Sequence, residues 1–154
     1  MDNWENTSRD NAETRARYIE RMFGRMGLSF KDGKILEVGS GNGFFLEKLR
    51  GEGADVVGVD RRPRGELGLP QAAADIEALP FADSTFQYVF SGAVFDKSIY
   101  TMQNQPKMLS EIARVLKPGG YYVGYVESIE AESPDHFRRI SAEDSLVPIY
   151  QKAA

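Results

Sequence analysis

Apolar residues recur at helical spacing near the start of the chain. The steps between them are four, three, four and three positions, and the residues are Ala12, Ala16, Ile19, Phe23 and Met26. Such spacing lines up one face of an amphipathic helix. We therefore expect a helix over residues 10–26 that ends at Gly27. Residues 1–8 carry no periodicity, and we expect them to form a flexible arm.

Short apolar runs and helical patterns alternate along the rest of the chain. Strands are expected over residues 34–38, 55–60, 71–74, 86–90, 121–126 and 145–151, of which the first two are buried and the last is an edge strand. Helices are expected over residues 43–50, 106–116 and 133–140. The Lys117–Gly120 segment holds a proline and two glycines and is expected to break the chain between helix and strand. This alternation predicts an α/β fold with a mostly parallel sheet.

The composition is that of one globular domain. The chain has 154 residues, of which 42% are apolar and 27% charged, and it contains no cysteine. We expect a single domain over residues 1–154, with an α/β core at residues 34–151. The lack of cysteine excludes disulfides, thiolate metal sites and a thiol nucleophile. The lone histidine, His136, leaves no histidine-rich site, so no metal is expected.

Net charge and hydropathy argue against nucleic-acid and membrane partners. The formal net charge is -4, whereas a non-specific nucleic-acid binder is usually basic. No apolar run approaches the ~18–20 residues that span a bilayer. The first residues, 1–6, are too polar for a signal peptide. We expect a cytoplasmic protein without a nucleic-acid or membrane partner.

A glycine-rich turn carries the first sign of chemistry. Gly39, Gly41 and Gly43 lie between a predicted strand and a predicted helix, where open α/β sheets bind ligands. Glycines allow a tight turn and close approach of a ligand to the backbone, and the amides at the helix start favour an anionic group. The third glycine stands one place early for the dinucleotide fingerprint G-x-G-x-x-G, which argues against NAD and FAD.

Asp60 ends the second predicted strand, 17 residues after Gly43. A carboxylate there can accept two hydrogen bonds from the 2′,3′-diol of a ribose. The alternative is an aspartate that caps the turn after the strand. The adjacent Arg61 and Arg62 suit a 2′-phosphate, which keeps NADP open as a ligand.

Four stretches together resemble the class I S-adenosylmethionine-dependent methyltransferases. They are residues 35–43, residues 57–60, residues 74–81 with 83–86, and residues 108–120, which follow the family's order and spacing. The resemblance implies a Rossmann-like, doubly wound, mostly parallel sheet with helices on both faces. The family sheet usually has seven strands and six are placed here, so we expect a shortened sheet of six or seven strands.

The resemblance also implies S-adenosylmethionine as the cofactor and a set of residues that bind it. The cofactor-binding residues are Glu37, Gly39, Ser40, Gly41, Gly43, Asp60, Arg61, Asp75, Ile76 and Ser91. The glycine turn with Ser40 would hold the methionine moiety, and Glu37 would attract its α-amino group as a charge-assisted pair. The alternative for Glu37 is a strand-end acid that pairs with the nearby Lys34 or with a helix.

The other residues of this set would bind the nucleoside and the methyl-donor end. Asp60 would accept from the ribose diol, and Asp75 would accept from the adenine 6-amino group. Ile76 suits either the adenine ring or the hydrophobic core, because both need an apolar side chain. Ser91 or its neighbour Gly92 would line the methyl-donor end.

Nothing in the sequence singles out a catalytic base. Residues 91–100 lack the Asp/Asn-Pro-Pro-Tyr motif of family members that methylate amide or nucleobase nitrogens, and the paired glutamates of arginine methylation are absent too. Asp96, Tyr100 and His136 are the polar candidates for acceptor contact or for a base. Each also has a purely structural interpretation, as a helix cap, a packing residue and an exposed residue, respectively.

The leading hypothesis is methyl transfer from S-adenosylmethionine by in-line displacement, with proximity and orientation as the main catalytic factors. The expected acceptor is a small molecule, with a protein side chain as the alternative. A second hypothesis is a catalytically silent S-adenosylmethionine-binding or scaffold subunit that needs a partner to complete the acceptor site. A third is an NAD(P) enzyme. Because we find no lid segment, a homodimer is a candidate to cover the open acceptor face.

Overall fold

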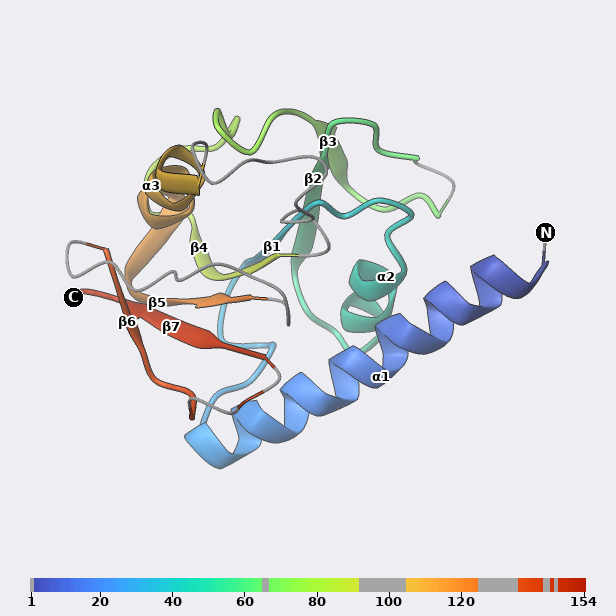
Figure 1. Ribbon diagram of the computed structural model, residues 1–154, viewed down its shortest axis with the longest axis horizontal. Coiled ribbons are helices and arrows are strands. Elements are labelled where there is room, and N and C mark those ends of the chain that lie inside the picture. The colour runs from blue at the N-terminus through green and yellow to red at the C-terminus, as the bar shows by residue number, and fades with distance from the viewer. Residues whose placement is uncertain (1, 65–66, 92–104, 125–135, 143–144, 146) are drawn as a thin grey trace.

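A twisted sheet with helices on both faces forms the centre of the structure, a computed structural model (Figure 1). The structure describes the whole chain except residues 1, 65–66, 92–104, 125–135, 143–144 and 146. The strands are β1 (Ile35–Val38), β2 (Val56–Asp60), β3 (Gln71–Ala73), β4 (Phe86–Ser91), β5 (Leu116–Val123), β6 (Phe137–Arg139) and β7 (Ile149–Lys152). The helices are α1 (Asp2–Met26), α2 (Phe44–Gly51) and α3 (Gln105–Val115).

The strand order in this seven-stranded sheet is β3-β2-β1-β4-β5-β7-β6. Strands β1 to β5 pair in parallel, and β7 runs antiparallel to both β5 and β6. The order reverses at β1, since β2 and β4 lie on either side of it. Ligands of open α/β sheets bind at such a switch point, beyond the carboxyl ends of the strands. The sheet confirms the predicted Rossmann-like class, with seven strands rather than six.

The two faces of the sheet are covered by different helices. Successive side chains of a strand point to opposite faces, so Ile35 packs with α1 and α2, while its neighbour Leu36 packs with α3. Burial on both sides explains why the central strands have continuous apolar runs. Glu37 has the parity of Ile35 and therefore faces α1 and α2. None of the helices in the described parts of the chain is long and apolar enough to cross a bilayer.

Helix α1 begins at Asp2, so the prediction of a flexible arm over residues 1–8 is wrong. The predicted end at Met26 is confirmed. Residues 2–8 lack an apolar period, but they contain no glycine or proline that would interrupt a helix. Asp2 and Glu5 also carry negative charge, which is favourable near the amino end of a helix.

The prediction of a helix that runs through Ile140 is wrong as well. Residues 133–135, which suggested its start, lie outside the described residues, and Phe137–Arg139 is the edge strand β6. Phe137 is buried and its ring lies 5.7 Å from that of Tyr122 between centroids, whereas Arg138 is exposed. Three residues are too few to show this alternation in the sequence, and pairing with β7 decides the conformation.

The prediction that Lys117–Gly120 separates α3 from the next strand is wrong, because α3 ends at Val115 and the segment lies within β5. Strand β5 already begins at Leu116, and its register against β4 shifts between Phe86 and Tyr88. Gly119 has a φ of 76°, which favours glycine. The segment is therefore an irregularity within β5, of the kind that a bulge produces. Strand β5 ends at Val123 rather than at residue 126, and β7 begins at Ile149 rather than at residue 145.

Candidate cofactor site

The glycine turn closes tightly against the carboxyl end of β2. Gly39, Gly41 and Gly43 have φ values of 72°, 51° and 86°, in the left-handed region that other residues rarely adopt. The amides of Gly39 and Ser40 both donate to the carbonyl of Val59, at 2.7 and 3.0 Å. The structure thus confirms the turn between a strand and a helix, and its backbone conformation requires the glycines.

Strands β2 and β3 brace the turn from the side. Gln71 Nε2 donates to Ser40 Oγ at 2.9 Å and to the Gly41 carbonyl at 3.2 Å. A Cβ atom on Gly58 would lie 2.7 Å from Ser40 Oγ and 2.6 Å from Leu46 Cδ1. The turn therefore rests on a glycine of β2 that the sequence analysis did not single out.

Replacing Gly58 by alanine is expected to destabilise the protein by about 1–3 kcal/mol, because the added methyl group must displace Ser40 or Leu46. Chemical denaturation measures the loss. Gly51→Ala is the matched control, since a Cβ there has no atom within 4 Å. Equal stabilities of the two variants would contradict the close contact at Gly58.

Glu37 is a buried carboxylate at the switch point, only 2% exposed. Its partner is Arg15 of α1, whose Nη1 lies 3.2 Å from Oε2. Arg15 Nη2 donates to the Ser91 carbonyl at 2.7 Å, and the guanidinium lies 4.2 Å from the centroid of the Phe45 ring. Arg15 thus joins β1, β4 and α2.

The pKa of Glu37 is raised to about 7, mainly by burial and to a smaller extent by the nearby charge of Asp60. The Arg15 guanidinium opposes this shift through its charge and its hydrogen bond. The sequence offers Lys34 or an unspecified helix as the structural partner of Glu37, and the structure shows that the partner is Arg15 of α1. The available signal was an arginine next to Ala16, within the apolar stripe of the predicted helix.

Asp60 anchors the glycine turn as well as its own strand end. Its Oδ2 accepts from the Gly41 amide at 2.9 Å, and its Oδ1 accepts from the Arg62 amide at 2.8 Å. These contacts match the interpretation of a capping aspartate. Binding of the ribose diol by Asp60 stays a prediction. The position of this carboxylate at the carboxyl end of β2 suits that role.

Asp75 follows β3 and caps the next turn. Its Oδ1 accepts from the Glu77 amide at 3.0 Å, and its Oδ2 lies 3.0 Å from Arg61 Nη2. The ion pair gives Arg61 a partner within the protein. Ile76 is 3% exposed and belongs to the core cluster that also contains Leu79, as its core interpretation expects.

The sequence of the α/β core matches a known protein family. Residues 36–124, more than half of the chain, match the family model of the methyltransferase domain. The chain belongs to this family. Membership confirms the predicted resemblance to the class I S-adenosylmethionine-dependent methyltransferases.

Individual relatives agree with the family assignment. The biotin biosynthesis bifunctional protein BioHC of Cellvibrio japonicus is 41% identical over 96 residues, which cover 56% of this chain and 18% of that protein. The methyltransferase domain described here spans between 18% and 40% of the length of such curated relatives.

Solved structures share the fold. A Burkholderia thailandensis 1,6-didemethyltoxoflavin-N1-methyltransferase with bound S-adenosylhomocysteine aligns with a TM-score of 0.68 at 16% identity, over 93% of this chain and 79% of that one. A putative methyltransferase in complex with the Haloferax volcanii Trm112 activator aligns with a TM-score of 0.53 at 28% identity, over 61% of this chain and 44% of that one.

The residues at the switch point fit S-adenosylmethionine, the cofactor of this family. Glu37, Asp60 and Asp75 lie in β1, at the end of β2 and just after β3, three strands that are neighbours in the sheet. The cofactor offers an ammonium, a ribose diol and an adenine amine, all of which donate hydrogen bonds. Carboxylates only accept them. Three acceptors on adjacent strands therefore match three donors on one ligand.

The methyl-donor end was predicted at Ser91, which ends β4 and is fully buried. Ser91 Oγ shares a hydrogen bond of 2.9 Å with the Tyr122 hydroxyl. Burial raises the pKa of Tyr122 above its usual range, so this phenol stays protonated at neutral pH. Ser91 and Tyr122 therefore form a neutral, buried pair beside Arg15.

Of the three acceptor-side candidates, His136 is the one that lies among the described residues, and it is not at this site. His136 borders β6 and lines a surface pocket with Gly119, Arg138 and Lys152. Lys152 Nζ donates to the carbonyl of Leu116, the first residue of β5, so this pocket lies near the amino ends of the parallel strands. His136 is thus at the opposite end of the sheet from Glu37. Asp96 and Tyr100 lie outside the described residues.

Proposed function

We propose that this protein transfers a methyl group from S-adenosylmethionine to a small molecule. The observation that carries the proposal is the set of three carboxylates, Glu37, Asp60 and Asp75, around a glycine turn in a chain of the methyltransferase-domain family. When bound, the cofactor supplies an electrophilic methyl group on a sulfonium, which is a good leaving group.

The chain's own residues bind and orient the reactants. The glycine turn offers backbone groups to the methionine moiety, and Glu37 pairs with its ammonium. Asp60 and Asp75 fix the nucleoside through its ribose and adenine donors. Holding donor and acceptor in line is itself a large catalytic contribution, so this mechanism needs no base among the described residues.

A small-molecule acceptor is supported by the relative named for biotin biosynthesis. A protein side chain remains the alternative acceptor. We further propose a cytoplasmic location, which the cysteine-free composition supports, and a second copy of the chain as one candidate to cover the acceptor side.

A second candidate function is a binding subunit that becomes active only with a partner. The Haloferax volcanii relative favours this candidate, because its solved complex contains a methyltransferase activator. In this case the chain binds S-adenosylmethionine through the same carboxylates, and the partner completes the acceptor site.

Calorimetry and a methyl-transfer assay test the two candidates. We expect saturable binding of S-adenosylhomocysteine and no binding of NADH or NADPH, and transfer of labelled methyl groups to a compound in a small-molecule extract. Binding without transfer, restored by a copurifying protein, would favour the subunit that needs a partner. Failure of the wild-type chain to bind S-adenosylhomocysteine would refute both.

Asp60→Ala is expected to weaken S-adenosylhomocysteine binding by about 1–3 kcal/mol, roughly a tenfold to hundredfold loss in affinity. The substitution removes the acceptor for the ribose diol and releases the Gly41 amide. Titration calorimetry measures the affinity, and Asp83→Ala, whose side chain is 78% exposed at the far end of the segment after β3, is the control. An unchanged affinity in Asp60→Ala would show that the ribose role is misassigned.

A further inference from the structure

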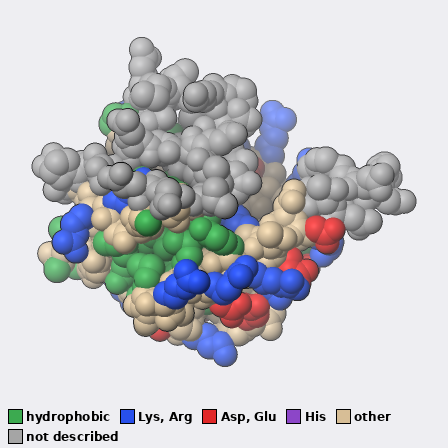
Figure 2. Space-filling model, turned by 60° about the horizontal axis from the view of Figure 1, so that its bottom comes forward, with side chains coloured by type: hydrophobic (Ala, Val, Ile, Leu, Met, Phe, Trp, Pro, Cys, Tyr) green, Lys and Arg blue, Asp and Glu red, His purple; other side chains and the backbone are tan. Residues whose placement is uncertain are grey.

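Arg15 differs from the three later arginines of α1 in where its side chain lies. Arg17, Arg21 and Arg25 occupy exposed positions of the helix. Basic side chains gather beside an apolar area on the face of the molecule that Figure 2 brings forward. The Arg15 side chain is only 12% exposed. It points inward, toward the carboxyl ends of β1 and β4.

A cation is costly to bury unless it is paired, and so is a carboxylate. Arg15 and Glu37 are buried together, and the guanidinium is fixed on three sides by Glu37, the Ser91 carbonyl and the Phe45 ring. The fork geometry of arginine suits such multiple contacts. Glu37 is therefore held in one orientation by a residue from outside the α/β core.

The other groups around Glu37 do not neutralise it. Asp60 of β2 is negative and disfavours a second charge nearby. The Tyr122 phenol of β5 is neutral, and α2 contributes the apolar Phe45. Among the groups described here, Arg15 is the cation that faces Glu37.

Helix α1 is docked where it can present this cation. Arg9 repeats the pattern of Arg15 six residues earlier, because it pairs with Glu47 at 2.7 Å and lies 4.3 Å from the centroid of the Phe44 ring. Two arginine–phenylalanine contacts thus join α1 to the first turn of α2, directly after the glycine turn (Figure 1).

We propose that Arg15 is a positioning residue for cofactor binding, which from α1 keeps the Glu37 carboxylate ionised and aimed and so links capture of the cofactor ammonium to the docking of α1. The proposal rests on the proposed function, since it assigns the ammonium of S-adenosylmethionine to Glu37. It adds a residue from outside the matched family region, residues 36–124.

The test is the pH dependence of S-adenosylhomocysteine binding, measured by calorimetry between pH 6 and 8.5. Glu37 has a pKa of about 7 in the free protein, and removing Arg15 takes away the two effects that lower it. We expect Arg15→Met to move the midpoint upward by about one pH unit or more. Affinity then falls about fivefold at pH 7 and less than twofold at pH 8.5.

Three variants make this result specific. Arg15→Lys keeps the positive charge, and its pH midpoint for binding is expected to lie close to that of the wild type. Arg17→Met removes an exposed arginine of the same helix and is expected to leave the midpoint unchanged. Glu37→Gln is expected to bind weakly with no midpoint in this range, because it has no carboxylate to titrate.

A wild-type midpoint in Arg15→Met would overturn the proposal if Glu37→Gln abolishes the pH dependence. Thermal melts establish that each variant is folded, and Arg15→Gln, which also removes the charge, repeats the comparison if Arg15→Met is unfolded. Failure of the proposed function has a different signature, since the wild-type chain then binds no S-adenosylhomocysteine at any pH.

Discussion

Replacing Glu37 by glutamine is expected to stabilise the free protein above pH 7 while it weakens S-adenosylhomocysteine binding. The folded state raises the pKa of Glu37 from 4.5 to about 7. A carboxyl group with a raised pKa favours folding below its unfolded pKa, and this contribution is lost as the pH rises through the folded pKa. At pH 8 the buried charge therefore costs roughly 3 kcal/mol, which a neutral glutamine of the same shape avoids.

Urea denaturation at pH 8 and pH 4.5 measures this effect. The variant is expected to gain about 2–3 kcal/mol at pH 8 and little at pH 4.5, where Glu37 is protonated in the folded wild type. Glu47→Gln is the matched control, since Glu47 is 44% exposed and its pair with Arg9 contributes no more than about 1 kcal/mol. A loss of stability at pH 8 would mean that leaving Arg15 without its partner outweighs the relief of the buried carboxylate.

A buried carboxylate that destabilises the fold suggests that its charge is kept for binding. Residues at functional sites often reduce stability, because activity can require a charged group at a position where its neutral form would be more stable in the free protein. Glu37 faces the same side of the sheet as Ile35 and could have been another apolar core residue. Opposite effects of Glu37→Gln on stability and binding would identify it as a functional residue rather than a structural one.

The sequence predicts the parallel half of this molecule well. Strands β1, β2 and β4 are short, mainly apolar runs, which are typical of buried parallel strands. The glycine turn is also encoded locally, since positive φ values at Gly39, Gly41 and Gly43 need glycine. Site residues at strand ends, such as Asp60, follow from these two patterns.

Features that depend on distant partners escape prediction. The Ser133-Pro134-Asp135 signature predicts a helix start. Phe137 nevertheless lies in a strand, because it pairs with β7 and its ring packs against Tyr122. The ion pair of Arg15 with Glu37 joins residues 22 positions apart in sequence. Local sequence patterns do not predict this pairing, because it depends on how α1 packs against the sheet.

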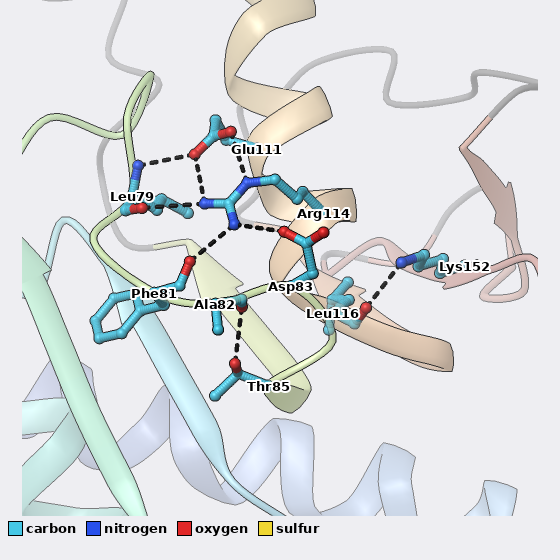
Figure 3. Close-up of polar contacts among 9 residues, drawn as sticks. All are labelled: Leu79, Phe81, Ala82, Asp83, Thr85, Glu111, Arg114, Leu116 and Lys152. Carbon is cyan, nitrogen blue, oxygen red and sulfur yellow. Dashed lines mark hydrogen bonds and ion pairs between the residues drawn. The ribbon is translucent and has the colours of Figure 1, made fainter.

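Arg114 holds the segment between Asp75 and β4 against α3 (Figure 3). Its Nη1 and Nη2 donate to the carbonyls of Phe81 and Leu79 at 2.8 and 3.0 Å. Glu111 completes the cluster, because it binds Arg114 through both oxygens and accepts from the Leu79 amide at 2.8 Å. Backbone groups of a connecting segment thus find their partners on a helix.

Arg114→Met is expected to lower the free energy of unfolding by about 2–4 kcal/mol. The substitution leaves two carbonyls and the Glu111 carboxylate without the hydrogen bonds from Arg114. Because the Arg114 side chain is only 31% exposed, water can replace only part of these hydrogen bonds. Arg114→Lys keeps the charge but cannot reach all of these acceptors at once, and we expect it to recover less than half of the loss. Urea denaturation at pH 7 measures both variants, and a change below about 0.5 kcal/mol in Arg114→Met would contradict this role.

The acid dependence of stability provides a second measurement of the same cluster. The hydrogen bonds from Arg114 hold the pKa of Glu111 below its usual value. A lowered folded pKa stabilises the fold above the unfolded pKa of about 4.5, and the contribution disappears as the pH falls through the folded value. The difference between wild type and Arg114→Met is therefore expected to shrink between pH 5 and pH 3. A difference that stays constant over this range would mean that Arg114 acts through its contacts with the carbonyls and not through Glu111.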